Sequence, residues 1–164
     1  MASESGSDSR KFLVIVDGTP ECRVAIYFAS RRARRTNGRV ALLYVIPPAD
    51  FQHWQAVEEV MRDEAREEAE QTLHDVAVEV KEVSGHLPEM IIKEGQTREQ
   101  IQQLIKQDAG IKVLVLGAAT GKMNPGPLIG AIATGGFVED PDTRLVPLTI
   151  VPGSLTRKDI DALT

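Results

Sequence analysis

The sequence has little cysteine and few aromatic residues. Of its 164 residues, one is a cysteine and 4% are aromatic. Cys22 has no partner for a disulfide within the chain, so we expect it to be a small buried residue. A chain of this length buries enough surface to fold as one domain, and its stability needs neither a disulfide nor a structural metal.

Long apolar runs are also missing. The first residues are small and polar, without the apolar core of a signal peptide. No run reaches the roughly 18 apolar residues that a membrane-spanning helix needs. We therefore expect a cytoplasmic protein with no membrane partner.

The chain has no excess of positive charge, since its formal net charge is -5. Contacts to the phosphates of nucleic acid need surplus Lys and Arg, so we expect no nucleic-acid partner. Two charged groups fall on predicted helices: the arginines within residues 31–35 and the glutamates between residues 58 and 82. We interpret both groups as solvated helix faces.

The motifs of several enzyme classes are absent. The sequence has no Gly-x-Ser-x-Gly nucleophile elbow and no His-Glu-x-x-His helix, and its three histidines lack the spacing of metal ligands. Enzyme activity is therefore not the expected function. Slow ATP hydrolysis is the most that we expect, and only if a nucleotide binds.

Short apolar runs alternate with segments of helical periodicity. Strands are predicted at residues 12–16, 40–46, 90–93, 113–116 and 148–151. Helices are predicted at about residues 20–36, 51–83, 97–108, 128–138 and 156–163. Five strands separated by helices predict an α/β fold with a parallel sheet, because crossovers between parallel strands need a helix.

Capping residues and composition mark the boundaries. Helix starts are predicted at Thr19, at Thr97 with Gln100 as a capping box, and at Ser154 or Thr156. Residues 1–10 are predicted to be a disordered tail, 11–153 the domain, and 154–164 a short helical extension.

Three large side chains precede the regular part of the second helix: Phe51, His53 and Trp54. They cap this helix against the sheet, or they overhang the strand ends. The sequence does not separate these two arrangements.

Glycines follow the fourth predicted strand at positions 117, 121, 126 and 130. Such a loop at the carboxyl end of a buried strand is typical of phosphate sites, because glycine permits positive φ and close approach to the backbone. The segment does not match a Walker loop, because Lys122 is followed by Met123. Two interpretations stay open: the glycines hold a phosphate, or they only form a tight turn between strand and helix.

Several segments together resemble one known family. Residues 16–21, Val-Asp-Gly-Thr-Pro-Glu, resemble the Val-Asp-Gly-Ser-Pro-Glu opening of the universal stress protein family. Residues 42–48 are similar to the family's second strand, and residues 147–153 to its fifth, which ends in Val-Pro-Gly. The resemblance implies an open five-stranded parallel sheet in the order 3-2-1-4-5, with helices on both faces in a Rossmann-like arrangement. It also implies a ligand crevice between strands one and four.

The resemblance further implies a nucleotide site in that crevice. Asp17 would lie near the ribose or a magnesium ion, and the backbone at Val45 near the adenine. Backbone N–H groups of residues 118–121 and 130–131 would hold the phosphates of ATP, with Lys122 as a counter-charge. The residues expected at this site are Val16, Asp17, Gly18, Thr19, Val45, Gly117, Ala118, Thr120, Gly121, Lys122, Gly130 and Ala131.

The family's ATP motif is altered in this chain. Gly117 and Gly130 match its first and last glycines, whereas Thr120 replaces its middle glycine. Ala131 replaces the Ser or Thr whose hydroxyl would contact phosphate. A missing hydrogen bond to a charged group costs about 1.5–3 kcal/mol of binding free energy.

The sequence leaves two functions open. The first is a cytoplasmic stress-response protein that binds ATP or a related adenine nucleotide, with Mg²⁺ at Asp17 if it binds Mg-ATP. The second is a dimeric interaction module with no nucleotide, in which the glycine loop is structural. The resemblance implies a homodimer, and an apolar edge strand is normally paired or protected. The expected interface is strand five, Leu148, Thr149, Ile150 and Val151.

Overall fold

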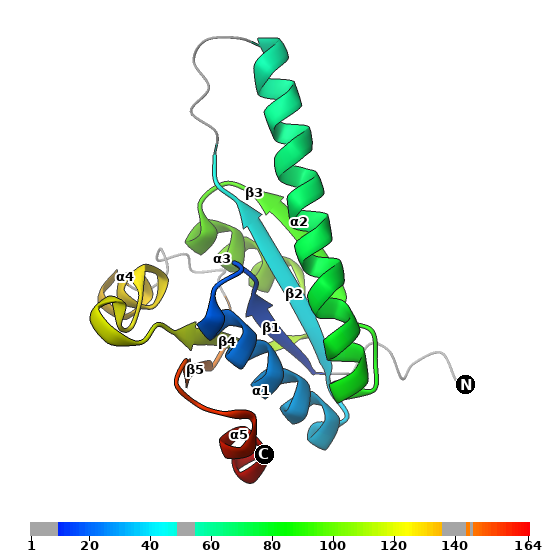
Figure 1. The fold of residues 1–164 in the computed structure, drawn as a ribbon, viewed down its shortest axis with the longest axis vertical. Helices are drawn as coiled ribbons and strands as arrows, with labels where there is room; N and C mark the ends of the chain where they lie inside the picture. Colours follow the sequence, from blue (N-terminus) through cyan, green and yellow to red (C-terminus); the bar gives the residue numbers. More distant parts are fainter. Residues whose placement is uncertain (1–9, 49–54, 136–143, 145) are drawn as a thin grey trace.

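The computed structural model describes residues 10–48, 55–135, 144 and 146–164. Its strands are β1 (Lys11–Ile15), β2 (Arg39–Ile46), β3 (Glu89–Glu94), β4 (Ile111–Ala118) and β5 (Leu148–Pro152). Its helices are α1 (Pro20–Thr36), α2 (Gln55–Ser84), α3 (Thr97–Gln107), α4 (Pro127–Gly135) and α5 (Arg157–Leu163), with a short 3-10 helix η1 (Gly121–Met123). All strands form one parallel sheet in the order β3-β2-β1-β4-β5, which confirms the predicted fold (Figure 1).

Some predictions fall on residues that the structure does not describe. They concern the tail up to residue 9, the end of the fourth helix beyond residue 135, and the arrangement of Phe51, His53 and Trp54. These remain predictions.

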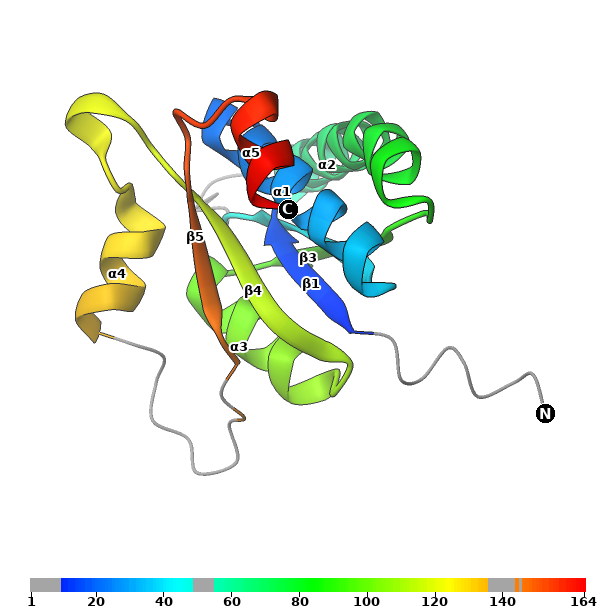
Figure 2. The same ribbon diagram turned by 90° about the horizontal axis from the view of Figure 1, so that it is seen from below.

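Side chains that alternate along each strand divide the core into two layers. On β1, Phe12 and Val14 pack with α1 and α2, whereas Leu13 and Ile15 pack with α3 and α4. Figure 2 shows α1, α2 and α5 on one side of the sheet and α3 on the other. Because helices cover both faces, the inner strands are apolar on both sides, as the continuous apolar runs predict.

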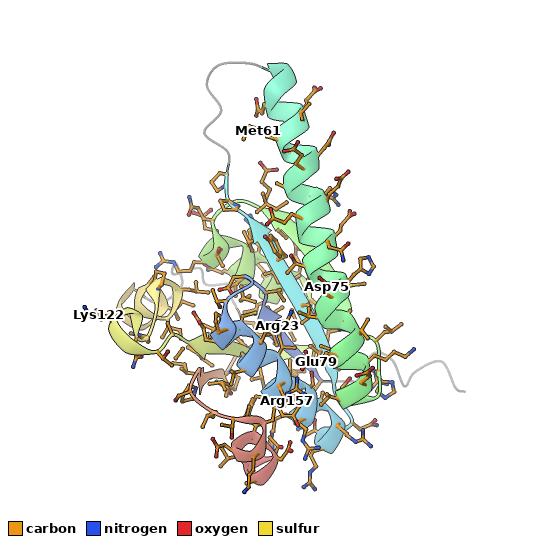
Figure 3. All side chains as sticks on the ribbon, in the orientation of Figure 1. Arg23, Met61, Asp75, Glu79, Lys122 and Arg157 are labelled. Carbon is orange, nitrogen blue, oxygen red and sulfur yellow. The ribbon has the colours of Figure 1, made fainter. Side chains whose placement is uncertain are left out.

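The longest helix is α2, with 30 residues. Its carboxyl-terminal half packs on the sheet through Leu73, Val76 and Val80, which are at most 3% exposed. Its amino-terminal half extends past the ends of the strands, where Val60 and Met61 are exposed (Figures 1 and 3). None of the described helices is both long enough and apolar enough to cross a membrane.

Two helix starts follow the predicted capping residues. Thr19 caps α1, because its hydroxyl oxygen accepts a hydrogen bond from the Cys22 N–H at 3.3 Å. Thr156 caps α5 in a capping box with Asp159. Of the two residues proposed for that start, Thr156 is therefore the cap.

The capping box predicted at the start of α3 is wrong. Thr97 is the first residue of the helix, and Gln96 is its N-cap. Gln96 makes no side-chain capping hydrogen bond. The physical reason is the turn at Gly95, whose φ of +140° ends β3 and leaves one extended residue before the helix.

Strand four is longer than predicted. Pairing with β5 continues through Gly117 opposite Val151 and Ala118 opposite Pro152, so both residues belong to β4. The glycine-rich loop therefore begins at Ala119 and not at Gly117.

Helix α5 is attached to α1 and α2 by polar contacts. The Tyr27 hydroxyl donates a hydrogen bond to Asp161 Oδ1 at 2.6 Å, and the Arg157 guanidinium lies 4.5 Å from the centre of the Tyr27 ring. Arg157 also forms an ion pair with Glu79, which lies 3.8 Å from Arg23 as well. Figure 3 shows these three charged side chains converging from α5, α2 and α1. The carboxyl-terminal extension thus packs against the same layer as α1.

The first turn of α1 lies directly against the end of β4. A Cβ atom added at Gly117 would lie 2.2 Å from the carbonyl oxygen of Glu21 and 3.2 Å from the nitrogen of Cys22. No side chain fits in that space, because the neighbouring atoms are backbone. Gly117 therefore serves close packing of α1 on β4, a structural role that differs from the tight turn considered from the sequence.

Replacing Gly117 by alanine should lower the free energy of unfolding by about 1–3 kcal/mol, because the added methyl group overpacks a rigid contact. Urea unfolding followed by circular dichroism measures the change. Gly130→Ala is the matched control: a Cβ there meets nothing within 4 Å. Alanine should leave stability unchanged or raise it by up to about 1 kcal/mol in this helix. Equal losses for the two variants would contradict the packing argument.

Candidate functional site

A large hollow lies at the carboxyl edge of the sheet. It has a volume of about 750 Å³ and is lined by the ends of β1 and β2 and the starts of α3 and α4. We call it the large crevice. Its lining residues are Ile15, Val16, Asp17, Tyr44, Val45, Pro47, Gln96, Thr97, Arg98, Glu99, Pro127, Leu128 and Ala131. Small-molecule sites commonly enclose roughly 300–1,000 Å³, so this crevice is large enough for a nucleotide.

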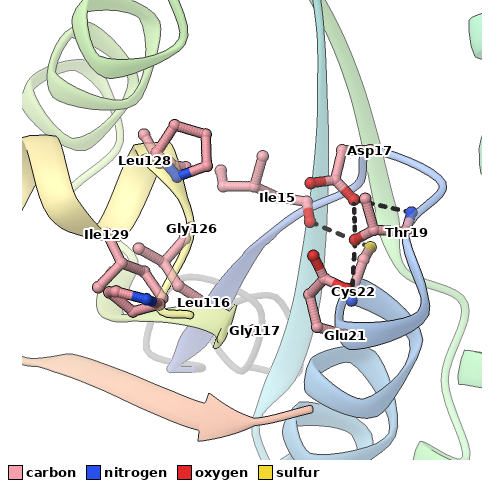
Figure 4. A pocket seen from close by; sticks show the side chains of 12 residues that line it. Ile15, Asp17, Thr19, Glu21, Cys22, Leu116, Gly117, Gly126, Leu128 and Ile129 are labelled. Carbon is pink, nitrogen blue, oxygen red and sulfur yellow. Dashed lines mark hydrogen bonds between the residues drawn. The ribbon is translucent and has the colours of Figure 1, made fainter. Parts of the chain in front are cut away.

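Two smaller hollows lie at the same edge of the sheet, and the first of them adjoins the large crevice. The small pocket, of about 80 Å³, lies between the β1–α1 turn and residues 125–129. Asp17 and Leu128 face each other across it (Figure 4), and both also line the large crevice. The outer pocket, of about 440 Å³, lies between residues 118–121 and residues 152–154.

Asp17 is held in a fixed orientation by the turn that follows β1. Its Oδ1 atom accepts hydrogen bonds from the Thr19 N–H at 3.0 Å and from the Thr19 hydroxyl at 2.6 Å (Figure 4). Gly18 between them has a φ of +77°, which favours glycine. Because Oδ1 is occupied by the turn, Oδ2 is the carboxylate oxygen that can contact a ligand.

Two other titratable groups near the crevice are neutral at physiological pH. Burial raises the pKa of the Cys22 thiol to about 12. Its Sγ donates a hydrogen bond to the carbonyl oxygen of Ile15 at 3.3 Å. Burial, together with the carboxylates of Glu68 and Asp17, also raises the pKa of the Tyr44 hydroxyl.

The structure distributes the predicted site residues among the three hollows. The large crevice brings together Val16, Asp17, Val45 and Ala131. The small pocket contains Asp17, Thr19 and Gly117, and the outer pocket contains Ala118, Thr120 and Gly121. Three predicted residues line none of these hollows: Gly18, Lys122 and Gly130.

Lys122 lies outside the hollows at the strand ends. It is exposed on η1, and Figure 3 shows it at the outer edge of the molecule. This position separates it from Asp17 and from the residues of the large crevice.

Two of the backbone donors expected to hold phosphate have partners within the protein. The Ala119 N–H donates to the carbonyl oxygen of Pro125 at 3.1 Å. The Gly130 N–H donates to the carbonyl oxygen of Gly126 at 3.0 Å, at the start of α4. Helix α4 therefore uses internally one of the groups that the altered ATP motif would have offered.

Sequence reasoning missed the contribution of residues 96–99. Arg98 lies in the first turn of α3, and its Nη1 donates a long hydrogen bond, of 3.5 Å, to the carbonyl oxygen of Ala131. Arg98 thus reaches across the crevice from α3 to α4. The predicted sheet order was a signal for this, because it places the segment after strand three at the same edge as those after strands one and two.

Comparison with known proteins identifies the family. The sequence model of the universal stress protein family matches residues 9–133. The chain belongs to the universal stress protein family. Comparison with curated proteins finds no significant match.

Solved structures of universal stress proteins share the fold. The universal stress protein UspA from Lactobacillus plantarum matches with a TM-score of 0.69 at 20% identity, covering 87% of this chain and 97% of that chain. The Archaeoglobus fulgidus universal stress protein in complex with dAMP matches with a TM-score of 0.61 at 16% identity, covering 88% and 98%. An Arabidopsis thaliana family member with AMP bound matches with a TM-score of 0.57 at 16% identity, covering 88% and 92%.

The Cys22 thiol should not react in the folded universal stress protein. Iodoacetamide at about pH 8 should leave it unmodified, because a buried thiol of high pKa forms little thiolate. The same reagent in urea should alkylate it fully, and mass spectrometry distinguishes the two states. Rapid alkylation of the native protein would contradict the assignment of Cys22 as a buried structural residue.

Proposed function

We propose that this universal stress protein binds an adenine nucleotide in the large crevice. The observation that carries the proposal is the meeting of Val16, Asp17 and Val45 with Ala131 around one hollow of about 750 Å³. Ligands of open α/β sheets bind outside the carboxyl ends of strands where the sheet order reverses, here between β1 and β4. The small pocket lies at that point, and the large crevice adjoins it through Asp17 and Leu128 on the β2 side of β1 rather than between strands one and four as predicted. The AMP and dAMP complexes of family members with the same fold support the choice of ligand.

The lining of the crevice suits the nucleoside part of the ligand. Tyr44 and Val45 on β2 provide aromatic and aliphatic surface for the adenine. The Oδ2 atom of Asp17 can accept hydrogen bonds from the ribose hydroxyls, because the turn holds the carboxylate in place. We also propose that this oxygen coordinates Mg²⁺ when the nucleotide brings one, because Mg²⁺ prefers carboxylate oxygens.

We infer a binding function, in which the protein senses the nucleotide by binding it. The acidic side chains that line the large crevice are those of Asp17 and Glu99, and slow ATP hydrolysis stays a prediction. The cytoplasmic location stays a prediction.

Filling the crevice should abolish nucleotide binding. Isothermal titration calorimetry should detect AMP binding to the wild type and none to Ala131→Phe, because the large side chain occupies the ligand's space. Ala131 is exposed on α4, so the variant should still fold.

Ala162→Phe is the matched control. Ala162 is exposed on α5 and lines none of the three hollows, so this variant should bind AMP like the wild type. Equal AMP affinity in all three proteins would refute the large crevice as the site.

A second candidate function, a dimeric interaction module, is supported by the edge of the sheet. The outer edge of β5 pairs with no other strand of the described chain. Leu148 and Ile150 on this strand are 37% and 45% exposed. Unprotected apolar edge strands tend to pair with another strand. We propose that two copies associate through β5, with or without nucleotide.

Sedimentation should show a dimer at micromolar concentration, and Ile150→Lys should shift it to the monomer, because a charge at the interface would lose its hydration. Leu163→Lys is the control, since Leu163 is 64% exposed on α5. A wild-type monomer would exclude this arrangement. AMP binding measured on the same Ile150→Lys protein shows whether nucleotide binding persists when association through β5 is lost.

A further inference from the structure

Arg98 carries a positive charge at the large crevice. Within the described part of the chain, it is the one cationic side chain that lines any of the three hollows. It lies on the wall of the large crevice formed by α3, and its guanidinium reaches the backbone of Ala131. Ala131 is the position at which the family motif would supply a phosphate-binding hydroxyl.

The contact that Arg98 makes can be exchanged for a ligand. Its bond to the Ala131 carbonyl is long, at 3.5 Å, and its acceptor is neutral. A phosphate oxygen is a stronger acceptor for guanidinium, and the planar fork of arginine can bind two phosphate oxygens at once. An anionic group beside Ala131 would therefore compete well for Arg98.

Further phosphates would meet an unfavourable environment. The small pocket beside the crevice has a volume of about 80 Å³ and is lined by the acidic residues Asp17 and Glu21. The Ala119 and Gly130 N–H groups, which would otherwise cradle a polyphosphate, donate to Pro125 and Gly126. The described lining thus provides one cation for a phosphate group, and the adjoining small pocket offers carboxylates in place of a second cation.

We infer that Arg98 binds the phosphate of the nucleotide in place of the hydroxyl missing at Ala131, and that the preferred ligand carries a single phosphate group. This inference rests on the proposed function, because it assigns the phosphate end of the same site. Arg98 then determines specificity, because it gives the crevice a higher affinity for the nucleotide than for the nucleoside.

The test compares adenosine, AMP and ATP by isothermal titration calorimetry in the absence of magnesium. The wild type should bind AMP about 10- to 100-fold more tightly than adenosine, as expected for a hydrogen-bonded contact to a charged group. ATP should bind no more tightly than AMP. In Arg98→Gln the AMP affinity should fall to that of adenosine, whereas the adenosine affinity should stay unchanged.

The ratio of AMP affinity to adenosine affinity makes the result specific. A loss of folding or a distorted crevice would weaken both ligands and leave the ratio unchanged, and that outcome would overturn the role of Arg98. Arg98→Lys keeps the charge and should retain part of the ratio. Lys122→Gln removes the same charge from the exposed η1 and should keep the whole ratio; a reduced ratio in this variant would assign the phosphate to Lys122 instead.

Two failures are distinguishable. If adenosine binds the wild type and Arg98→Gln keeps the preference for AMP, the role of Arg98 is overturned and the proposed function stands. If neither adenosine nor AMP binds the wild type, the proposed function fails and the Arg98 assignment fails with it. Tighter binding of ATP than of AMP would overturn the preference for a single phosphate.

Discussion

The backbone contact between α1 and β4 determines the geometry on which the rest of the structure depends. The first turn of α1 lies so close to Gly117 that a Cβ atom there would overlap the Glu21 carbonyl. Gly153, just after β5, packs against the same residue, since a Cβ there would lie 2.9 Å from the Glu21 Cβ. Two strands therefore support the start of α1 at close range. The turn with Asp17 precedes that helix directly, so its position relative to β4 and α4 is fixed by backbone packing.

In the proposed nucleotide site, the nucleoside end lies against this fixed turn, whereas the phosphate end lies beside α4. The side facing β1 and β2 depends on the sheet and on the fixed turn, and it keeps Asp17 and Val45 around one crevice. The side facing α4 depends on a loop whose N–H groups bond to Pro125 and Gly126 within the chain. Anion recognition at this end therefore needs a side chain from another element. In the proposal made above, that side chain is Arg98, which α3 brings across the crevice.

Much of the fold could be predicted, because its signals are local and repeated. Each strand is a short apolar run, and each crossover has a helical period, so the element order follows from the sequence. The N-caps at Thr19 and Thr156 could also be predicted, because an N-cap residue directly precedes the helix that it caps. The capping box expected at Thr97 does not form, because the turn at Gly95 places Gln96 at the N-cap of α3. The end of β4 was missed because pairing with β5, a distant segment, extends the strand through Ala118.

At the site, the order of residues along the chain predicts which of them follow the strands, and the resemblance to universal stress proteins implies the sheet order. That information placed Asp17 and Val45 at one edge, and the structure brings both to the large crevice. The position of Lys122 at the outer edge and the contact of Arg98 with Ala131 arise from the folding of the whole chain. The same holds for the role of Gly117 in helix packing. The physical reason is that these roles depend on distances between segments far apart in the chain, and a local sequence pattern does not encode such distances.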